Sequence, residues 1–413
     1  MTLAKASQTM HDSPPTLARY MPQLDGLRAL AVFAVVWSHW MPIHSAFAPG
    51  PSDSWLVVGG YWVWDLTMRL PWGHFGVQLF FVLSGFLITG ILLRAKPQPG
   101  ESRGPVLKQF FIRRSLRIFP AYYLILAIAW LADFNDTRAT IIWHATYSTS
   151  IYLWLTKAFS PTSHFWSLSV EEHFYLLWPW VVLWTTPKTL LRVTIFMILA
   201  TPVFQILMQW IGPQIRPAVL LWLDLPNIGS SLSWLSAETE PTVLMPSAAD
   251  ALGAGALLAL VENCEDWKQT FRRIQVLACL PIFVILQGDA FLKGYGLPGS
   301  AESIRETTMV VTFSLIVSQA ATGFRGPVGW VLAHPLLTGV GKISYGVYLI
   351  HNFTPHLMTL FLNQTPIGAD RFYALHDGWR FVGLWVLTLA LAGTSWFLIE
   401  RPCLRLKDRW GKV

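Results

Sequence analysis

The apolar segment LDGLRALAVFAVVWSHW, residues 24–40, contains two ionisable side chains that could do chemistry, Arg28 and His39. Burying an ionisable side chain in a membrane-spanning run is expensive, so such residues are functional candidates. His39 follows Arg28 by 11 positions. On an α-helix this is a rotation of about 1100° and a rise of about 16 Å. The spacing therefore predicts that both side chains point to one helix face at different depths.

Two carboxylates lie in a second apolar segment, HFWSLSVEEHFYLLWPW, residues 164–180. Glu171 and Glu172 come about one turn into this run, where a carboxylate must be paired, protonated or solvated by a cavity. Ser167, Glu171 and Tyr175 share a face through their spacing of four. The structural alternative is a polar helix cap with an interfacial glutamate, which we favour for Glu172.

Three arginines cluster in FFIRRSLRIFPAYY, residues 110–123, where a further apolar run begins: Arg113, Arg114 and Arg117. An ordinary cytoplasmic anchor explains at least one of them. The functional alternative is recognition of a phosphorylated cytosolic ligand, because the planar fork of arginine matches phosphate oxygens better than lysine does. Spacing alone leaves both interpretations open.

The composition indicates a membrane protein, since only 13% of the residues are charged and 53% are hydrophobic. The net charge of +7 fits basic cytoplasmic loops, and no basic and aromatic module supports nucleic-acid binding. Cys264, Cys279 and Cys403 lack paired spacing, and none of the histidines has metal-ligand spacing. No apolar stretch in the first twenty residues suggests a cleavable signal peptide.

Apolar runs between polar or Pro/Gly-rich breaks predict an all-α, polytopic transmembrane bundle of about ten spanning helices. We expect them at residues 24–43, 75–94, 118–132, 166–186, 193–211, 248–262, 274–290, 306–322, 343–363 and 380–399. The expected organisation is a cytoplasmic tail over residues 1–23, one transmembrane domain over 24–400 and a cytoplasmic tail over 401–413.

The distribution of Lys and Arg predicts that both termini are cytoplasmic. Most of these residues fall in alternate loops, at 94–117, 187–192, 262–273 and 323–342, and in the C-terminal tail. This assignment requires residues 141–157 to be an amphipathic or re-entrant piece; if they span, there are eleven helices and the later ones invert. The expected outer loops, 44–74 and 212–247, are rich in tryptophan and form either an interfacial belt or a platform for sugar rings.

Several common catalytic motifs are missing from the sequence. It has no phosphate loop, no HExxH zinc motif, no GxSxG nucleophile elbow and no H-x4-D element of soluble acyltransferases. Gly85, Gly253 and Gly255 are interpreted as sites of close helix packing.

Six segments stand in an order that resembles the acyltransferase 3 family of membrane-bound O-acyltransferases. They are LDGLRALAVFAVVWSHW, GVQLFFVLSGFLI, FFIRRSLRIFPAYY, FWSLSVEEHFYLLWP, ISYGVYLIH and FLIERP. The family's Arg-x10-His element falls on Arg28 and His39, and its Arg-x-x-Arg element on Arg114 and Arg117. Its Ser-Leu-x-Val-Glu element ends on Glu171, which separates Glu171 from Glu172.

The resemblance implies transfer of an acetyl group from cytosolic acetyl-CoA to a hydroxyl of a cell-surface or exported carbohydrate, such as an exopolysaccharide or lipopolysaccharide. His39 would be the general base and Glu171 would hold its imidazole. Arg28, Arg114 and Arg117 would bind the CoA phosphates. Acceptor binding is assigned to the side chains Trp166, Tyr175 and His351, and no metal is expected.

Two departures from the family pattern and two alternatives accompany this interpretation. The loop 44–74 is long, and Ala248 and Ala249 precede Asp250 where many members have an arginine, so Asp250 receives no role.

A secondary transporter or exporter is the alternative from another class. Within the enzymes, the alternatives are a longer acyl chain or a secreted small-molecule acceptor such as a macrolide. The expected location is the bacterial inner membrane, with a membrane or periplasmic partner of the polysaccharide pathway.

Overall fold

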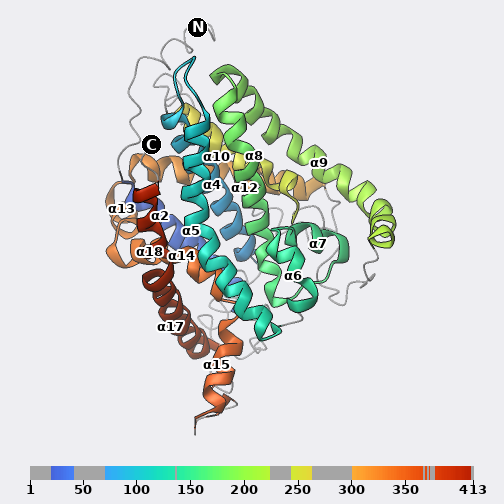
Figure 1. Ribbon diagram of the computed structural model, residues 1–413, viewed down its shortest axis with the longest axis vertical. Coiled ribbons are helices and arrows are strands. Elements are labelled where there is room, and N and C mark those ends of the chain that lie inside the picture. Colours follow the sequence, from blue (N-terminus) through green and yellow to red (C-terminus); the bar gives the residue numbers. More distant parts are fainter. Residues whose placement is uncertain are drawn as a thin grey trace, which may run out of the picture.

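The structure is a computed structural model that describes residues 20–40, 70–134, 137–223, 243–262, 300–365, 368–369, 372 and 377–410. All regular secondary structure in these residues is helical (Figure 1). The expected helix at 274–290 and most of the tryptophan-rich loops 44–74 and 212–247 lie outside the described residues.

The principal helices follow one another along the chain with short connections between many of them. They are α2 (Pro22–Trp40), α4 (Trp72–Ala95), α5 (Gly104–Leu131), α6 (Thr137–Ala145), α7 (Thr149–Thr156), α8 (Phe165–Trp184), α9 (Pro187–Trp222), α10 (Ala249–Val261), α12 (Ser300–Thr322), α13 (Gly326–Leu332), α14 (Pro335–Ile350), α15 (Thr354–Asn363), α17 (Asp377–Ser395) and α18 (Arg401–Trp410). A short 3₁₀ helix, η3 (Pro161–His164), leads into α8, and the π-helical turn η8 (Trp396–Glu400) joins α17 to α18.

Helices occur at nine of the ten predicted spans, but several bounds differ. α5 begins at Gly104, well before the predicted residue 118. The predicted span starts late because the first turns of α5 carry the arginine cluster and are therefore not an apolar run. α9 continues to Trp222 through three internal prolines, Pro202, Pro213 and Pro217.

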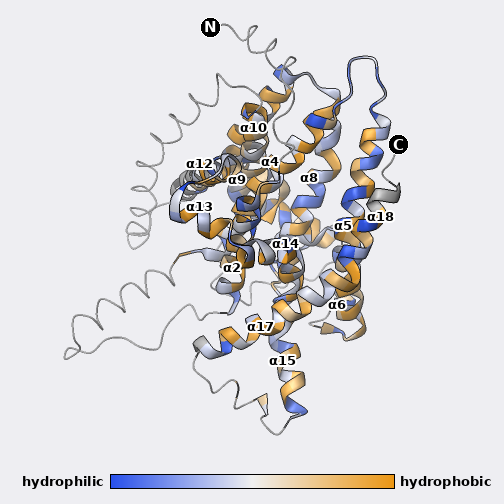
Figure 2. Ribbon diagram, turned by 90° about the vertical axis from the view of Figure 1, so that its left-hand side faces the viewer, coloured by the Kyte–Doolittle hydropathy of each residue, from blue (hydrophilic) through white to orange (hydrophobic). Residues whose placement is uncertain are grey.

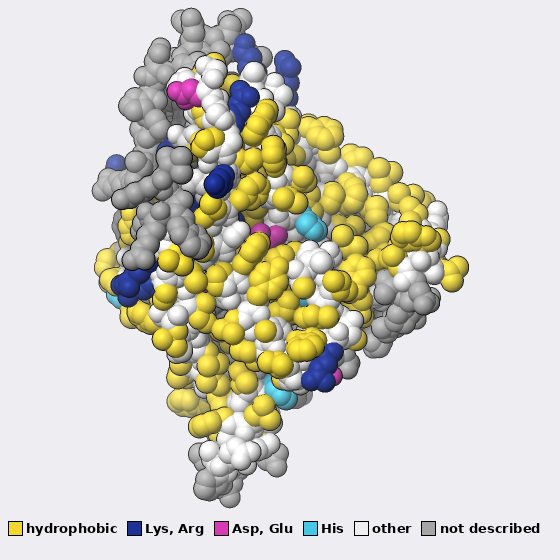
Figure 3. Space-filling model, in the orientation of Figure 1, with side chains coloured by type: hydrophobic (Ala, Val, Ile, Leu, Met, Phe, Trp, Pro, Cys, Tyr) yellow, Lys and Arg dark blue, Asp and Glu magenta, His cyan; other side chains and the backbone are white. Residues whose placement is uncertain are grey.

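Four helical stretches among the described residues are long and apolar enough to cross a membrane. They are Trp72–Ala95, Gly104–Leu131, Pro187–Trp222 and Trp379–Leu406. The outer faces of these helices are apolar too: Phe196, Trp210 and Leu221 of α9 are 69%, 75% and 85% exposed. Figure 2 colours much of the helical ribbon as hydrophobic, and Figure 3 shows hydrophobic side chains over much of the face that it presents. Such a surface fits a lipid environment.

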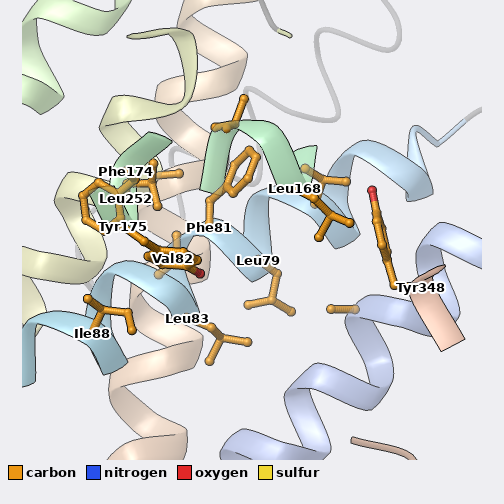
Figure 4. Close-up of a cluster of buried hydrophobic side chains, with 14 of the residues drawn as sticks. Leu79, Phe81, Val82, Leu83, Ile88, Leu168, Phe174, Tyr175, Leu252 and Tyr348 are labelled. Carbon is orange, nitrogen blue, oxygen red and sulfur yellow. The ribbon is translucent and has the colours of Figure 1, made fainter. Parts of the chain in front are cut away.

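α4 forms the centre of the bundle. Of its most apolar stretch, 72% is buried inside the protein, against 22% for α9. Its side chains pack against those of α2, α8 and α10 in one apolar core, part of which Figure 4 shows together with Tyr348 of α14. Because α4 is enclosed by neighbours, polar residues on it face other helices rather than lipid.

Glycines let the central helices approach within backbone contact. A Cβ atom on Gly85 of α4 would lie 2.0 Å from the carbonyl oxygen of Leu252 on α10, and one on Gly255 would lie 2.1 Å from that of Val82. The predicted role of these two glycines in close packing is confirmed. At Gly253 the nearest atom would be 3.2 Å away, so that contact is looser.

Two predicted segments are interrupted by turns. Residues 141–157 form the short helices α6 and α7, joined at Tyr147, whose φ is positive. Neither helix is long enough to cross a bilayer, which favours the non-spanning interpretation. The segment 343–363 breaks between α14 and α15, where the His351 ring binds the carbonyl oxygen of Tyr348 and Pro355 lacks the amide that would continue the helix.

Gly341 and Gly339 of α14 offer a matched test of the close packing. Gly341→Ala would place a Cβ 1.9 Å from the carbonyl oxygen of Asp25 on α2, whereas Gly339 faces open space. We expect Gly341→Ala to destabilise the protein by about 1–3 kcal/mol. Gly339→Ala should be neutral or stabilising by up to about 1 kcal/mol, because alanine favours a helix. Thermal unfolding of the detergent-purified variants measures both; equal stability would show that the two helices can separate freely.

Candidate active site

α2 carries Arg28 and His39 on one unbroken helix, and both side chains face α14. Arg28 lines a small cavity to which α14 contributes Tyr345 and Tyr348. Further along α2, Nδ1 of His39 lies 3.2 Å from Nε2 of His351, the C-cap residue of α14. The two residues therefore share a face at different depths, as their spacing predicts.

Arg28 is neutralised by a residue that sequence reasoning missed. Its Nη1 lies 2.9 Å from Oδ1 of Asp25, one turn earlier on α2. The other carboxylate oxygen of Asp25 accepts a hydrogen bond of 2.9 Å from the Tyr20 hydroxyl. Because residues three positions apart are neighbours on a helix, the spacing of Asp25 and Arg28 could have predicted this ion pair. This ion pair lowers the cost of placing the guanidinium in an apolar bundle.

A cavity of about 570 Å³ lies where α2, α4, α5 and α8 meet, and guanidinium groups dominate its polar lining. The five arginines that line it are Arg28, Arg94, Arg113, Arg114 and Arg117. Apolar side chains such as Leu87, Ile91 and Phe110 complete the wall. A cavity with this lining suits an elongated ligand that combines several negative charges with apolar or neutral parts.

Arg114 is held by aromatic and acidic neighbours on α8. Its guanidinium lies over the ring of Tyr175, 3.6 Å from the ring centroid. Nη2 lies 3.8 Å from Glu171 and Nε lies 3.9 Å from Glu172. Nε of Arg114 is buried without a hydrogen bond in the structure. These contacts fix the guanidinium plane and leave hydrogen-bonding capacity for a ligand.

Ser84 links this group to α4. Its hydroxyl donates a hydrogen bond of 2.7 Å to Glu171 and accepts one of 2.8 Å from the Tyr175 hydroxyl. A smaller cavity of about 90 Å³ adjoins the larger one, since both are lined by Arg28, Ser84, Arg114, Arg117 and Tyr175. The smaller cavity continues toward Ser167 and Tyr348, whose hydroxyls lie 2.5 Å apart.

Next to Tyr348, the rings of His39, His351 and His164 form a row with His351 in the middle. The ring centroids of His39 and His351 are 4.9 Å apart, and those of His351 and His164 are also 4.9 Å apart. His351 and His164 are buried, whereas His39 is exposed. His164 was not predicted as a site residue. It has no periodic or charge signal, and it lies near His351 because the end of η3 contacts the end of α14, where the Tyr348 hydroxyl donates to the carbonyl oxygen of His164 at 2.8 Å.

The hydrogen bonds of the row assign its tautomers. Nδ1–H of His39 donates to the carbonyl oxygen of Val35 at 2.9 Å, and Nδ1–H of His351 donates to that of Tyr348 at 2.7 Å. Nε2 of His351 can then accept from Nδ1–H of His39. Nε2 of His39 is left as an unprotonated nitrogen, which is the form that a general base requires.

The contacts of Glu171 connect it with Arg114 and Ser84 rather than with His39. His164 precedes Glu171 by seven positions, roughly 10 Å of helix rise, so the histidine row and the carboxylate lie at different depths. The residue that contacts the imidazole of His39 is His351. The structure thus brings Arg28, Arg114, Arg117, Glu171 and Tyr175 together and pairs His39 with His351.

Trp166 lies apart from both cavities' linings. It packs edge-to-face on Phe81 at 6.2 Å and is partly buried. Its predicted part in acceptor binding stays a prediction, as do those of Tyr175 and His351. Among the described residues, no group of three or more His, Cys, Asp or Glu side chains could hold a metal ion.

The apolar helical bundle, the arginine-lined cavity and the row of imidazoles are the features of a membrane protein whose cavity suits an anionic ligand. The model of the acyltransferase 3 family, an acyltransferase domain, matches residues 21–399, and the chain belongs to this family. The chain is 32% identical over 417 aligned residues to the peptidoglycan O-acetyltransferase OatA of Listeria monocytogenes. That alignment covers 93% of this chain and 56% of the Listeria protein.

A second relative is an uncharacterized protein of Haemophilus influenzae, 30% identical over 243 residues. This alignment covers 53% of the chain and 91% of the Haemophilus protein. No solved structure matches the chain. Because the alignment with OatA covers 56% of the Listeria protein, the chain spans about half the length of that relative.

Glu171 and Glu172 provide a test of the site. Glu171→Ala removes a carboxylate that faces Arg114 and accepts a hydrogen bond from Ser84, whereas Glu172→Ala removes a carboxylate that faces Arg114 at a similar distance but does not accept from Ser84. Losing a charged hydrogen-bond acceptor costs about 1.5–3 kcal/mol. We expect Glu171→Ala to lower acyl transfer at least tenfold, and Glu172→Ala to lower it less than about threefold. The measurement is the O-acetyl content of the envelope carbohydrate of cells that express each variant at equal membrane levels. Equal losses would contradict the distinction.

Proposed function

We propose that this protein is an integral membrane O-acyltransferase that transfers an acetyl group from cytosolic acetyl-CoA to a hydroxyl of a cell-surface carbohydrate. Membership of the acyltransferase 3 family supports the reaction class. The peptidoglycan O-acetyltransferase activity named for the Listeria relative supports a carbohydrate of the cell envelope as the acceptor. The inner membrane, where cytosolic CoA and exported carbohydrate can meet, is the location that fits both substrates.

The observation that carries the proposal is the arginine-lined cavity. CoA thioesters combine phosphates at one end with a long neutral arm that ends in the thioester. Arginines bind phosphate through paired N–H groups, and they do so most strongly where water is excluded. Arg28, Arg114 and Arg117 line both cavities. They are therefore placed to hold phosphates while the neutral arm continues into the smaller cavity.

His39 is proposed as the general base. It lies about 16 Å of helix rise from Arg28, so a donor anchored at the arginines can extend its thioester toward the histidine row. Nε2 of His39 takes the proton of the acceptor hydroxyl as the oxygen attacks the thioester carbonyl. The C–S bond then breaks, the ester leaves, and the proton passes to the thiolate to give free CoA.

His351 and Glu171 are proposed to support different groups. His351 accepts from Nδ1–H of His39 and so holds the base in the required tautomer. Glu171 holds Arg114 and Ser84 at the junction of the two cavities. This differs from the arrangement expected from the sequence, in which Glu171 orients His39, because His351 occupies the position beside the imidazole.

His39→Ala tests the assignment of the base. We expect the variant to reach the membrane at normal levels but to transfer acetyl at least about a hundredfold more slowly, since a positioned base contributes roughly 10²–10⁴ in rate. O-acetyl groups released from envelope carbohydrate by mild alkali report the activity. His334→Ala is the control, because His334 caps the N-terminus of α14, the end opposite His351. Near-normal acetylation by His39→Ala would remove His39 from the reaction.

Arg114→Ala combined with Arg117→Ala tests the donor site. Loss of two charge-assisted contacts should raise the apparent KM for acetyl-CoA at least tenfold, with a smaller effect on kcat. The control is Arg138→Ala, which removes an exposed partner of Asp133 beyond the end of α5. Acetyl-CoA binding by the purified wild-type protein without an ion gradient separates this function from transport. A change confined to acceptor dependence would place these arginines in another site.

A further inference from the structure

The five arginines of the larger cavity form two sets. Arg28, Arg114 and Arg117 also line the smaller cavity, whereas Arg94 and Arg113 line only the larger one. We call the first three the inner arginines and the last two the outer arginines. The larger cavity therefore carries two arginines that the smaller one lacks.

The helices give the separation of the two sets. On α4, Arg94 follows Ser84 by ten positions, about 15 Å of rise, and Ser84 belongs to the junction of the cavities. On α5, Arg113 precedes Arg117 by one turn, about 6 Å, and directly precedes Arg114, so it lies at the edge of the inner set while Arg94 lies farther out. Both outer arginines lie toward the connection between α4 and α5, at the top of the bundle in Figure 1.

The two sets also differ in their acidic partners. Arg28 pairs with Asp25, and Arg114 lies near two glutamates. No carboxylate lies within 4.0 Å of the guanidinium of Arg94 or Arg113 in the part of the chain that the structure describes. Arg113 is exposed and Arg94 is partly buried, so neither needs an acidic partner in the protein, and both are available for charge-assisted hydrogen bonds with an anionic ligand in the cavity.

The proposed donor supplies such a charge. CoA carries a pyrophosphate next to its neutral pantetheine arm and a separate phosphate on the 3′ oxygen of its ribose, further from the thioester. If the arm spans the distance from the inner arginines to His39, the pyrophosphate lies at the inner arginines. The ribose and its 3′-phosphate then lie on the side of the inner arginines where Arg113 and, farther along, Arg94 line the cavity.

We propose that Arg94 and Arg113 bind the 3′-phosphate and make the protein select CoA thioesters over their 3′-dephospho forms. This inference rests on the proposed function, because it takes a CoA thioester as the donor. The outer arginines act by recognising a part of the donor remote from the thioester. Their loss should therefore remove discrimination between donors without removing the inner phosphate site.

The test compares two ligands on two proteins. Titration calorimetry of the purified full chain in detergent measures binding of acetyl-CoA and of acetyl-3′-dephospho-CoA. We expect the wild type to bind acetyl-CoA at least about tenfold more tightly. The variant with Arg94→Gln and Arg113→Gln should bind both ligands alike, at the affinity that the wild type shows for the dephospho form. Retained binding of the dephospho form also shows that the variant is folded.

Arg103→Gln is the matched control. Arg103 caps the start of α5 and lies over Trp184 at the same end of the bundle, but it does not line the cavity. This variant should keep the wild-type preference. A loss of preference in Arg103→Gln as large as in the double variant would overturn the proposal, because general surface charge would then explain the effect.

The remaining outcomes separate the inference from the proposed function. If the wild type binds neither ligand, the proposed donor is wrong and the inference falls with it. If the wild type binds both ligands equally, the donor stands and the inference is overturned. Equal weakening of both ligands in the double variant would assign the outer arginines to the pyrophosphate. If the double variant changes only the binding of phosphatidylglycerol in mixed micelles, the arginines hold a lipid phosphate, which also overturns the inference.

Discussion

Guanidinium groups inside an apolar bundle impose the constraint on which this structure depends. Arginine does not give up its proton, so each buried arginine needs partners. Arg28 forms an ion pair with Asp25. Arg114 lies over the ring of Tyr175 and near the carboxylates of Glu171 and Glu172. These partners stabilise the arginines only in part, because Nε of Arg114 lacks a hydrogen bond. The unused capacity faces a cavity, which is where an anionic ligand gains most.

Close helix packing places the second half of the site. A Cβ on Gly26 of α2 would lie 2.1 Å from the carbonyl oxygen of Leu332, and Gly341 of α14 touches the backbone of Asp25. With α2 and α14 fixed in this register, His39 meets His351 at the far ends of the two helices. The same contact sets the position of Asp25 and hence of Arg28. The regions proposed for the donor and the acceptor are thus coupled through one helix interface.

The sequence predicts elements and depths better than it predicts partners. Apolar runs located nearly all the helices, and the helical spacing of Arg28 and His39 predicted their shared face. The pairing of His39 with His351, 312 positions later, depends on which helices pack together, and a single sequence carries no direct signal of that. Glu171 was expected beside His39 because acidic residues commonly orient a catalytic imidazole. In the structure the Glu171 carboxylate instead contacts Arg114 and Ser84, which come from helices that the analogy did not consider.

The orientation of hydrogen bonds in the histidine row gives the site a direction. Nδ1–H of His351 is committed to the carbonyl oxygen of Tyr348, which leaves Nε2 of His351 as an acceptor. Nδ1–H of His39 is shared between that acceptor and the carbonyl oxygen of Val35. Every donor in the pair therefore points into the bundle, and the basic nitrogen of His39 points away from its partners. In the proposed reaction, the acceptor hydroxyl would reach this nitrogen from the exposed side of His39 and the thioester would approach from the side of the cavities, so the two substrates would not need to share an entrance.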